Sequence, residues 1–256
     1  MHFRNTYEDA RYAAAYAALE LPGTYSLAFR DLPGVLARYV TGRRALDFGC
    51  GAGRSTRFLR RLGFDAVGVD ISPEMIRLAH EIDPRGAYRL IGDGDLATLG
   101  AEPFDLILCA FPFDNIPTMD GKARTLESLR SLLADGGRIV NLVSSPEIYL
   151  HEWVSFSTKA FPENRLARSG DVVRIINLAV DSRVPTEDVL WTGDAWADTY
   201  RRAGLSILAT ITPLAGPGDP GPWVNETRIA PWVIYVLTRP ADAGRSAEVH
   251  GDGLHG

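Results

Sequence analysis

Apolar residues along the chain follow two patterns that alternate with each other. Mostly apolar runs of strand length occur at residues 45–48, 67–71, 88–92, 103–111 and 138–145. Between them, apolar residues recur at helical spacing, as at Phe58, Leu59 and Leu62. Within the run at 103–111, the residues from Leu106 to Phe111 are continuously apolar, which favours a parallel strand buried on both faces. Five strands alternating with helical segments predict an α/β fold built on a doubly wound parallel sheet.

The segment before the first strand is predicted to be helical at both of its ends. Residues 6–20 are rich in alanine, and Pro22-Gly23 provides a stop signal for a helix there. A tyrosine-bearing loop then leads to a second helix around residues 36–40. Residues 1–40 therefore form a helical segment that precedes the sheet.

The alternation stops at residue 145. Residues 145–192 are predicted to be an insertion that contains two β-strands, one within GDVVRIINLAV and one near Val189. A helix over 192–205 and two strands at 205–214 and 230–239 then complete a single domain over residues 1–240. Residues 241–256 lack an apolar period, which predicts a flexible tail.

Composition narrows the class of protein. The 256 residues are 46% hydrophobic and carry a net charge of -5, and no basic cluster suggests a nucleic-acid partner. Cys50 and Cys109 fit small buried residues of a reducing compartment, and no Cys/His cluster suggests a metal. No signal peptide or apolar run of about 20 residues is present, so a cytoplasmic protein without a membrane partner is expected.

The stretch ALDFGCGAGRST joins the first strand to a helix through Gly49, Gly51 and Gly53. A dinucleotide fingerprint, G-x-G-x-x-G/A, would need a small third residue at the position of Arg54. Asp47 heads the turn, and a carboxylate there suits a ligand with an ammonium or sulfonium better than a pyrophosphate. The alternative is a tight turn that binds no ligand.

An acidic residue also follows the second strand, about 20 residues after the glycines, as contact with ribose hydroxyls requires. This residue, Asp70, could alternatively cap the next helix, but Ser72, Pro73 and Glu74 already provide a cap signal.

The acid-x-G-x-G-x-G pattern resembles the first motif of the class I S-adenosylmethionine-dependent methyltransferases, and the resemblance spans about residues 40–143. It implies a Rossmann-like seven-stranded sheet, mostly parallel with the last strand antiparallel. It implies S-adenosylmethionine as cofactor and S-adenosylhomocysteine as product. The cofactor contacts that it implies are Asp47, Gly49, Cys50, Gly51, Gly53, Asp70, Ile71, Met75, Asp93, Gly94, Asp95, Ala110 and Phe111. Asp93 would accept a hydrogen bond from the adenine amino group, and Asp95 is the alternative residue for this role.

In this family, N-terminal helices often form a lid over the cofactor. Tyr16, Tyr25 and Arg30 are then candidate contacts, with Arg30 pairing with the methionine carboxylate. The alternative is that both tyrosines are core residues and Arg30 is a surface charge.

Two stretches after strand ends could bind a substrate. In FPFDN, Phe113 and Asn115 would contact a flat polar ring, with Asp114 as a catalytic candidate. The insertion over 145–192 is expected to form a cap over the substrate. Its candidate site residues are Glu147, Tyr149, His151 and Trp153. His151 is the second catalytic candidate, because a histidine beside a carboxylate can act as a base, although a structural or surface role is the alternative.

FPFDN, the SPEIY segment and the PW-x-IYVL ending look like a branch of small-molecule methyltransferases, similar to enzymes that N-methylate azapteridine-type heterocycles in toxoflavin biosynthesis. The resemblance implies in-line methyl transfer to a small aromatic or heterocyclic metabolite, with N-methylation favoured over O- or S-methylation. The competing hypotheses are a non-catalytic S-adenosylmethionine-binding protein and a nicotinamide-dependent oxidoreductase. A monomer or a homodimer is expected.

Overall fold

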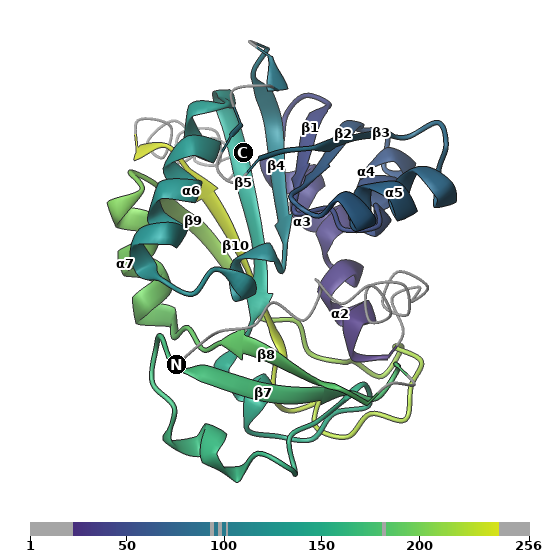
Figure 1. Cartoon of the computed structure of the whole chain (residues 1–256), viewed down its shortest axis with the longest axis vertical. Coiled ribbons are helices and arrows are strands. Elements are labelled where there is room, and N and C mark those ends of the chain that lie inside the picture. Colours follow the sequence, from purple (N-terminus) through teal and green to yellow (C-terminus); the bar gives the residue numbers. More distant parts are fainter. Residues whose placement is uncertain (1–22, 93–94, 97–98, 101, 181–182, 241–256) are drawn as a thin grey trace, which may run out of the picture.

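The computed structural model describes residues 23–92, 95–96, 99–100, 102–180 and 183–240. Its centre is a seven-stranded sheet in the order β3-β2-β1-β4-β5-β10-β9 (Figure 1). The strands are β1 Arg44–Phe48, β2 Asp65–Asp70, β3 Ala87–Leu90, β4 Phe104–Ala110, β5 Leu133–Ser144, β9 Ser206–Ile211 and β10 Trp232–Thr238. Strands β1 to β5 pair in parallel, and β10 pairs antiparallel with both β5 and β9. The predicted α/β sheet and its antiparallel last strand are confirmed.

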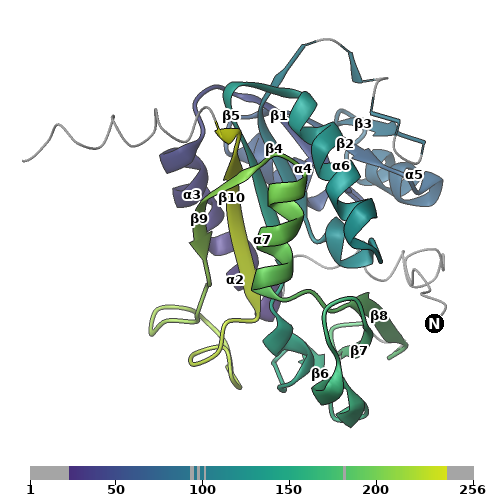
Figure 2. The ribbon, with the colours of Figure 1, turned by 90° about the vertical axis from the view of Figure 1, so that its left-hand side faces the viewer.

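Helices cover both faces of this sheet, and they are α2 Thr24–Arg30, α3 Leu32–Tyr39, α4 Arg54–Arg61, α5 Pro73–Ile82, α6 Met119–Ser131 and α7 Gly193–Arg202. Figure 2 shows α2 and α3 on one side of the sheet and α6 and α7 on the other. Successive strand residues feed two separate cores, as the alternation along a strand requires. Leu106 and Leu108 pack with α2, α3 and α4, whereas Ile107 and Cys109 pack with α6 and α7.

Local cap signals in the sequence fix several helix starts. Ser72 Oγ accepts from the Met75 amide at 3.3 Å, which confirms the predicted cap of α5. The Thr192 side chain accepts from the Ala195 amide and caps α7.

Two elements differ from the sequence prediction. Residues 24–30 form helix α2 rather than a loop, because they bury Tyr25 and Leu27 in the core under β10. Helix α6 ends at Ser131, before Asp135-Gly136-Gly137, a sequence typical of a helix end, and Leu133 begins β5 opposite Phe104. The glycine pair after it lies within the strand, where the register shifts.

The insertion forms a second, three-stranded antiparallel sheet of β6 Phe156–Ser157, β7 Val172–Asn177 and β8 Pro185–Val189. The two predicted strands are therefore present. This sheet lies beyond the carboxyl ends of β4 and β5 (Figure 1). Three short 3-10 helices, Pro112–Asn115, Pro146–Tyr149 and Pro162–Leu166, connect these parts.

A buried carboxylate ties α2 to the insertion. Glu226, from the loop before β10, accepts from Thr24 Oγ1 at 2.7 Å and from the Val154 amide at 2.8 Å. Its second oxygen accepts from the amides of Val224 and Asn225. Thr24 and Ser155 also exchange two hydrogen bonds, so the start of α2 is held against the insertion.

Among the helices in the described ranges, none has the length and apolar character that crossing a membrane requires.

Candidate cofactor and substrate site

The glycine turn between β1 and α4 needs all three of its glycines. Gly49, Gly51 and Gly53 have φ values of 71°, 52° and 82°, in the left-handed region that favours glycine. A Cβ on Gly49 would lie 2.4 Å from Pro112, and one on Gly53 would lie 2.6 Å from the ring of Tyr88. A Cβ on Gly51 would meet only Met75 Sδ, at 3.9 Å. The turn is thus packed tightly at both ends and open at Gly51, where a ligand can approach the main chain.

The backbone amides of the turn donate hydrogen bonds to other groups of the protein. The Gly49 and Cys50 amides donate to Val69 O at 2.9 and 3.0 Å, and the Gly51 amide donates to Asp70 Oδ2 at 2.8 Å. Asp70 Oδ1 accepts from the Ser72 amide at 2.9 Å, so its carboxylate ties the end of β2 to the turn. Burial raises the pKa of Asp70, although these amides oppose the shift. Its role toward a ribose stays a prediction.

Asp47 is buried beneath the turn rather than beside an open surface. Its Oδ2 accepts from Ser55 Oγ at 2.7 Å and from Thr56 Oγ1 at 2.5 Å, both in the first turn of α4. Its Oδ1 has no partner among the described residues. Burial raises the pKa of Asp47 to about 6, against the effect of the two hydroxyls. Asp47 can therefore act on a ligand through its charge, without direct contact.

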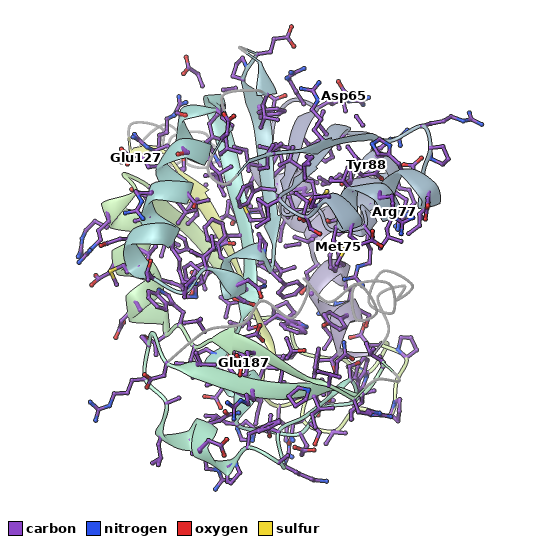
Figure 3. All side chains as sticks on the ribbon, in the orientation of Figure 1. Asp65, Met75, Arg77, Tyr88, Glu127 and Glu187 are labelled. Atoms are coloured by element: carbon purple, nitrogen blue, oxygen red, sulfur yellow. The ribbon has the colours of Figure 1, made fainter. Side chains whose placement is uncertain are left out.

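The predicted cofactor contacts Ile71 and Met75 lie at the β2–α5 corner. Ile71 follows Asp70 and is 55% exposed, so its side chain is accessible to a ligand. Met75 is buried against Ala52 at the start of α5, on the same side of the molecule as Tyr88 (Figure 3). Asp95 donates its amide to Gly92 O.

Three predicted contacts, Tyr16, Asp93 and Gly94, lie outside the described residues.

Arg30 lies at the surface and is engaged by other groups. It pairs with Asp31 at 2.7 Å and with Asp219, and it donates to Leu214 O at 3.0 Å. The hydrogen bond to Asp31 raises its pKa further. This placement fits the alternative reading of a surface charge, and a contact with a methionine carboxylate would require these pairs to open.

A cavity opens between α2, the ends of β4 and β5, and the insertion. It holds about 450 Å³ of empty space, its open mouth included, and is lined by Tyr25, Phe111, Asp114, Asn115, Ser144, Ile148, Tyr149, Phe156, Ile175, Asn177, Thr186, Asp188 and Trp232. Aromatic rings form much of its wall. Phe111, at the exit of β4, has a φ of 70°, a strained value for a residue other than glycine. Such strain is common at binding sites, and here it accompanies a ring that lines the cavity.

The polar part of the cavity contains two carboxylates that interact. Asp114 Oδ2 accepts from the Ser144 amide at 3.1 Å, and Asp188 Oδ2 accepts from the Tyr149 hydroxyl at 3.1 Å. Burial raises the pKa of Asp114 to about 6 and that of Asp188 to about 7, the latter also through the charge of Asp114. The fully buried Lys122 acts on both carboxylates, and burial lowers its pKa to about 8.

Two amide side chains on the cavity wall each have an unpartnered atom. Asn115 Oδ1 and Asn177 Nδ2 are buried without a hydrogen-bond partner in the described part of the chain. An unsatisfied buried polar atom costs about 1–3 kcal/mol, which a bound ligand can recover.

Part of the chain that carries this site matches a known protein family. Residues 46–139 match the family described as "Methyltransferase domain". Over these residues the chain is similar to a methyltransferase domain. The match covers the glycine turn, Asp70 and the strands up to β5, so the recognition made from the sequence is confirmed.

The relatives extend this finding to the fold. The ubiquinone biosynthesis O-methyltransferase of Xylella fastidiosa is 32% identical over 104 residues, 39% of this chain and 41% of the relative. The chain thus matches about two fifths of that relative's length. The structure of the CcbJ methyltransferase from Streptomyces caelestis has a TM-score of 0.64 at 17% identity and covers 93% of this chain and 99% of its own. An S-adenosylmethionine-dependent methyltransferase from Clostridium acetobutylicum has a TM-score of 0.59 at 13% identity and covers 92% of this chain and 98% of its own. The Rossmann-like methyltransferase fold is confirmed, and these findings support S-adenosylmethionine as the cofactor.

The cavity includes only some of the predicted substrate residues. Asp114, Asn115 and Tyr149 line it, together with the predicted cofactor contacts Tyr25 and Phe111. The other predicted residues do not line it.

Phe113 is a core residue between Phe48 and Trp196, at ring distances of 5.9 and 6.2 Å. Trp153 is buried and donates to Ile148 O at 2.9 Å.

His151 and Glu147 bond to each other at 3.0 Å in a partly exposed position. The placement of His151 fits the surface alternative, and its catalytic role stays a prediction.

Sequence reasoning missed several residues of this site, among them Lys122, Asn177, Asp188 and Trp232. Alternation along β7 places Asn177 on the same buried face as Val173 and Ile175, and this signal could have identified it. The sequence carries no signal that brings Asp188 or Lys122 to Asp114.

Proposed function

We propose that this chain transfers a methyl group from S-adenosylmethionine to a small aromatic or heterocyclic metabolite, at nitrogen in preference to oxygen or sulfur. The observation that carries the proposal is the cavity with aromatic walls and two carboxylates, which lies next to the glycine turn of a methyltransferase domain.

The cofactor half of the site would be formed by the β1–α4 turn, Asp70, Ile71 and Met75. Bound S-adenosylmethionine supplies a methyl group that is already activated by its sulfonium. The protein then has to align the acceptor atom with that methyl group, and such positioning contributes roughly 7–11 kcal/mol in favourable cases. In this proposal, residues 1–40 are the lid; residues 1–22 lie outside the described residues, and α2 places Tyr25 on the cavity wall.

The substrate half would be formed by the insertion over 145–192, which acts as a cap. Tyr25, Phe156 and Trp232 would pack against a flat ring. Asp114, Asp188 and Asn115 Oδ1 are acceptors, so they favour an acceptor molecule with N–H groups.

O-methylation is the second candidate. It is supported by the Xylella relative, named a ubiquinone biosynthesis O-methyltransferase, since a phenol O–H could also donate to either carboxylate. A protein that binds S-adenosylmethionine without catalysis is a further alternative. A nicotinamide-dependent oxidoreductase is the least favoured, because Arg54 occupies the third small position of the dinucleotide fingerprint.

Methyl transfer from S-adenosylmethionine labelled in its methyl group to a metabolite extract would test the proposal. We expect label in a small product, and nuclear magnetic resonance of that product identifies the methylated atom. Asp70→Asn is the control that should lose the label. Cofactor binding without any labelled product would favour the non-catalytic alternative. A cytoplasmic location and a monomeric or homodimeric state remain predictions, and residues 241–256, for which a tail was predicted, lie outside the described residues.

A further inference from the structure

We propose that the cavity selects a substrate whose nitrogen base is protonated at neutral pH, and that Asp188 binds this group and accepts its proton. The inference rests on the proposed methyl transfer and narrows its substrate class to an amine or a basic ring nitrogen. Two independent features of the cavity support it, its ring of aromatic side chains and its charge balance.

Four aromatic rings lie next to one another on the cavity wall. Tyr25 lies 5.0 Å from Phe156 and 5.6 Å from Trp232, and Phe111 lies 4.8 Å from Trp232, measured between ring centroids. Aromatic faces attract cations, and clustered rings are a recurrent way of binding ammonium groups. The Arg54 guanidinium already lies over the ring of Tyr25, 5.5 Å from its centroid, so this wall suits a positively charged group as well as a flat ring.

The ionised side chains of the cavity leave one negative charge uncompensated. Asp188, on β8, faces the Tyr149 hydroxyl, Asp114 and Lys122, which come from three other elements. When all are charged, two carboxylates face one ammonium. A substrate with one positive charge balances this set, whereas a phenolate or carboxylate would add a further negative charge in a buried site.

Lys122 lies behind the carboxylates and does not line the cavity. Its Nζ donates to Phe113 O and lies 4.8 Å from the ring of Trp191 and 5.1 Å from that of Trp196. It therefore supports the carboxylates from within the core as a positioning residue. The substrate would meet the carboxylates and not the lysine.

A protonated nitrogen has no free electron pair, so it must lose a proton before it attacks. The ammonium N–H proton passes to the Asp188 carboxylate. The freed nitrogen pair then forms the bond to the methyl carbon, while the pair of the breaking carbon–sulfur bond stays on sulfur. The product is the methylated ammonium, and the Asp188 carboxyl returns its proton to water.

Titration of benzylamine and benzyl alcohol into the full chain saturated with S-adenosylhomocysteine tests the inference by calorimetry. The two probes share a ring and differ in charge. We expect benzylamine to bind at least tenfold more tightly. Asp188→Asn should remove most of that preference and leave the affinity for benzyl alcohol unchanged.

Glu187→Gln is the matched control. Glu187 is the neighbouring carboxylate on the same strand of the small sheet (Figure 3). It pairs with Arg174 at 3.2 Å. It does not line the cavity, so this variant should keep the preference for benzylamine.

A permanent cation gives a second readout. The affinity for phenyltrimethylammonium should rise between pH 5 and pH 8 as Asp114 and Asp188 ionise, because their pKa values are about 6 and about 7. Asp188→Asn should flatten that rise. If this variant does not fold, two measurements on the wild type test the inference. They are the comparison of benzylamine with benzyl alcohol and the pH profile of the affinity for phenyltrimethylammonium.

Equal affinities for benzylamine and benzyl alcohol, or no binding of benzylamine, overturn the inference. Either result with normal binding of S-adenosylhomocysteine leaves the proposed methyl transfer standing. Failure to bind S-adenosylhomocysteine would count against the proposed function itself, so the two failures are distinguishable.

Discussion

Replacing Asp47 with asparagine is predicted to stabilise the ligand-free protein and, at the same time, to weaken its binding of the cofactor. Asp47 is fully buried, and only one of its oxygens is hydrogen-bonded, by Ser55 and Thr56. A buried carboxylate in this setting is costly while it is ionised. Its charge under the glycine turn is useful only when a positively charged ligand is bound above it.

The size of the stability effect follows from the pKa of Asp47, which burial raises from 3.8 to about 6. A displacement of about two units corresponds to about 3 kcal/mol of unfavourable free energy above pH 6. Asparagine removes this cost but places an unpartnered amide where Oδ1 lies, which costs about 1–3 kcal/mol. A net gain on the order of 1 kcal/mol is expected at pH 8.

The pH dependence has a definite sign. Because the folded pKa lies above the unfolded value, the folded state binds the proton more tightly, and this contribution to stability is lost as pH rises from about 4 to about 6. The advantage of asparagine should therefore appear above pH 6 and disappear toward pH 4. Urea unfolding of both proteins across this range measures it.

The effect on binding should depend on the ligand's charge. At an effective dielectric of about 20, a unit charge within about 10 Å of another contributes on the order of 1–2 kcal/mol. Asp47→Asn should raise the Kd of S-adenosylhomocysteine, which carries an ammonium, by about tenfold, and leave that of adenosine unchanged. Asp70→Asn is the matched comparison. It should lower the affinity for both ligands, because the predicted partner of Asp70 is the ribose that both ligands contain.

Calorimetric titration of the two ligands into the two variants gives this pattern directly. The reasoning is refuted if Asp47→Asn lowers stability at pH 8. It is also refuted if adenosine and S-adenosylhomocysteine lose affinity equally in that variant.

The remaining predictions concern packing and catalysis. Gly53→Ala should cost at least 2 kcal/mol more than Gly63→Ala in urea unfolding, because both glycines have positive φ but only Gly53 would clash, with Tyr88; equal costs would contradict this. Glu226→Gln should cost about 2 kcal/mol, since an amide group would face N–H donors, and a stability within 0.5 kcal/mol of wild type would argue against the tie between α2 and the insertion. His151→Ala should retain turnover in the methyl-transfer assay if His151 is a surface residue, and a loss of more than tenfold would restore it as a base.

The sequence predicted the cofactor half of the molecule better than the substrate half. The turn at Gly49, Gly51 and Gly53 and the acid at Asp70 depend on local backbone geometry, which spacing along the chain encodes. The strands of the sheet were predictable because strands buried on both faces are continuously apolar.

The substrate half depends on contacts between distant segments. Asp114, Lys122 and Asp188 come from a 3-10 helix, an α-helix and a strand of the small sheet, and no local pattern places them together. Asp47 was expected beside the ligand. Its side chain instead lies under the turn, where its carboxylate accepts hydrogen bonds from Ser55 and Thr56 on α4. Spacing along a chain gives the end of the sheet where a residue lies, whereas packing decides where its side chain points.

The most direct test of the central claim is a calorimetric comparison of S-adenosylhomocysteine with NAD(H). The account predicts that S-adenosylhomocysteine binds at one site with a Kd in the micromolar range or below, about -8 kcal/mol, and that NAD(H) gives no binding heat. Binding of NAD(H) without binding of S-adenosylhomocysteine would contradict the account.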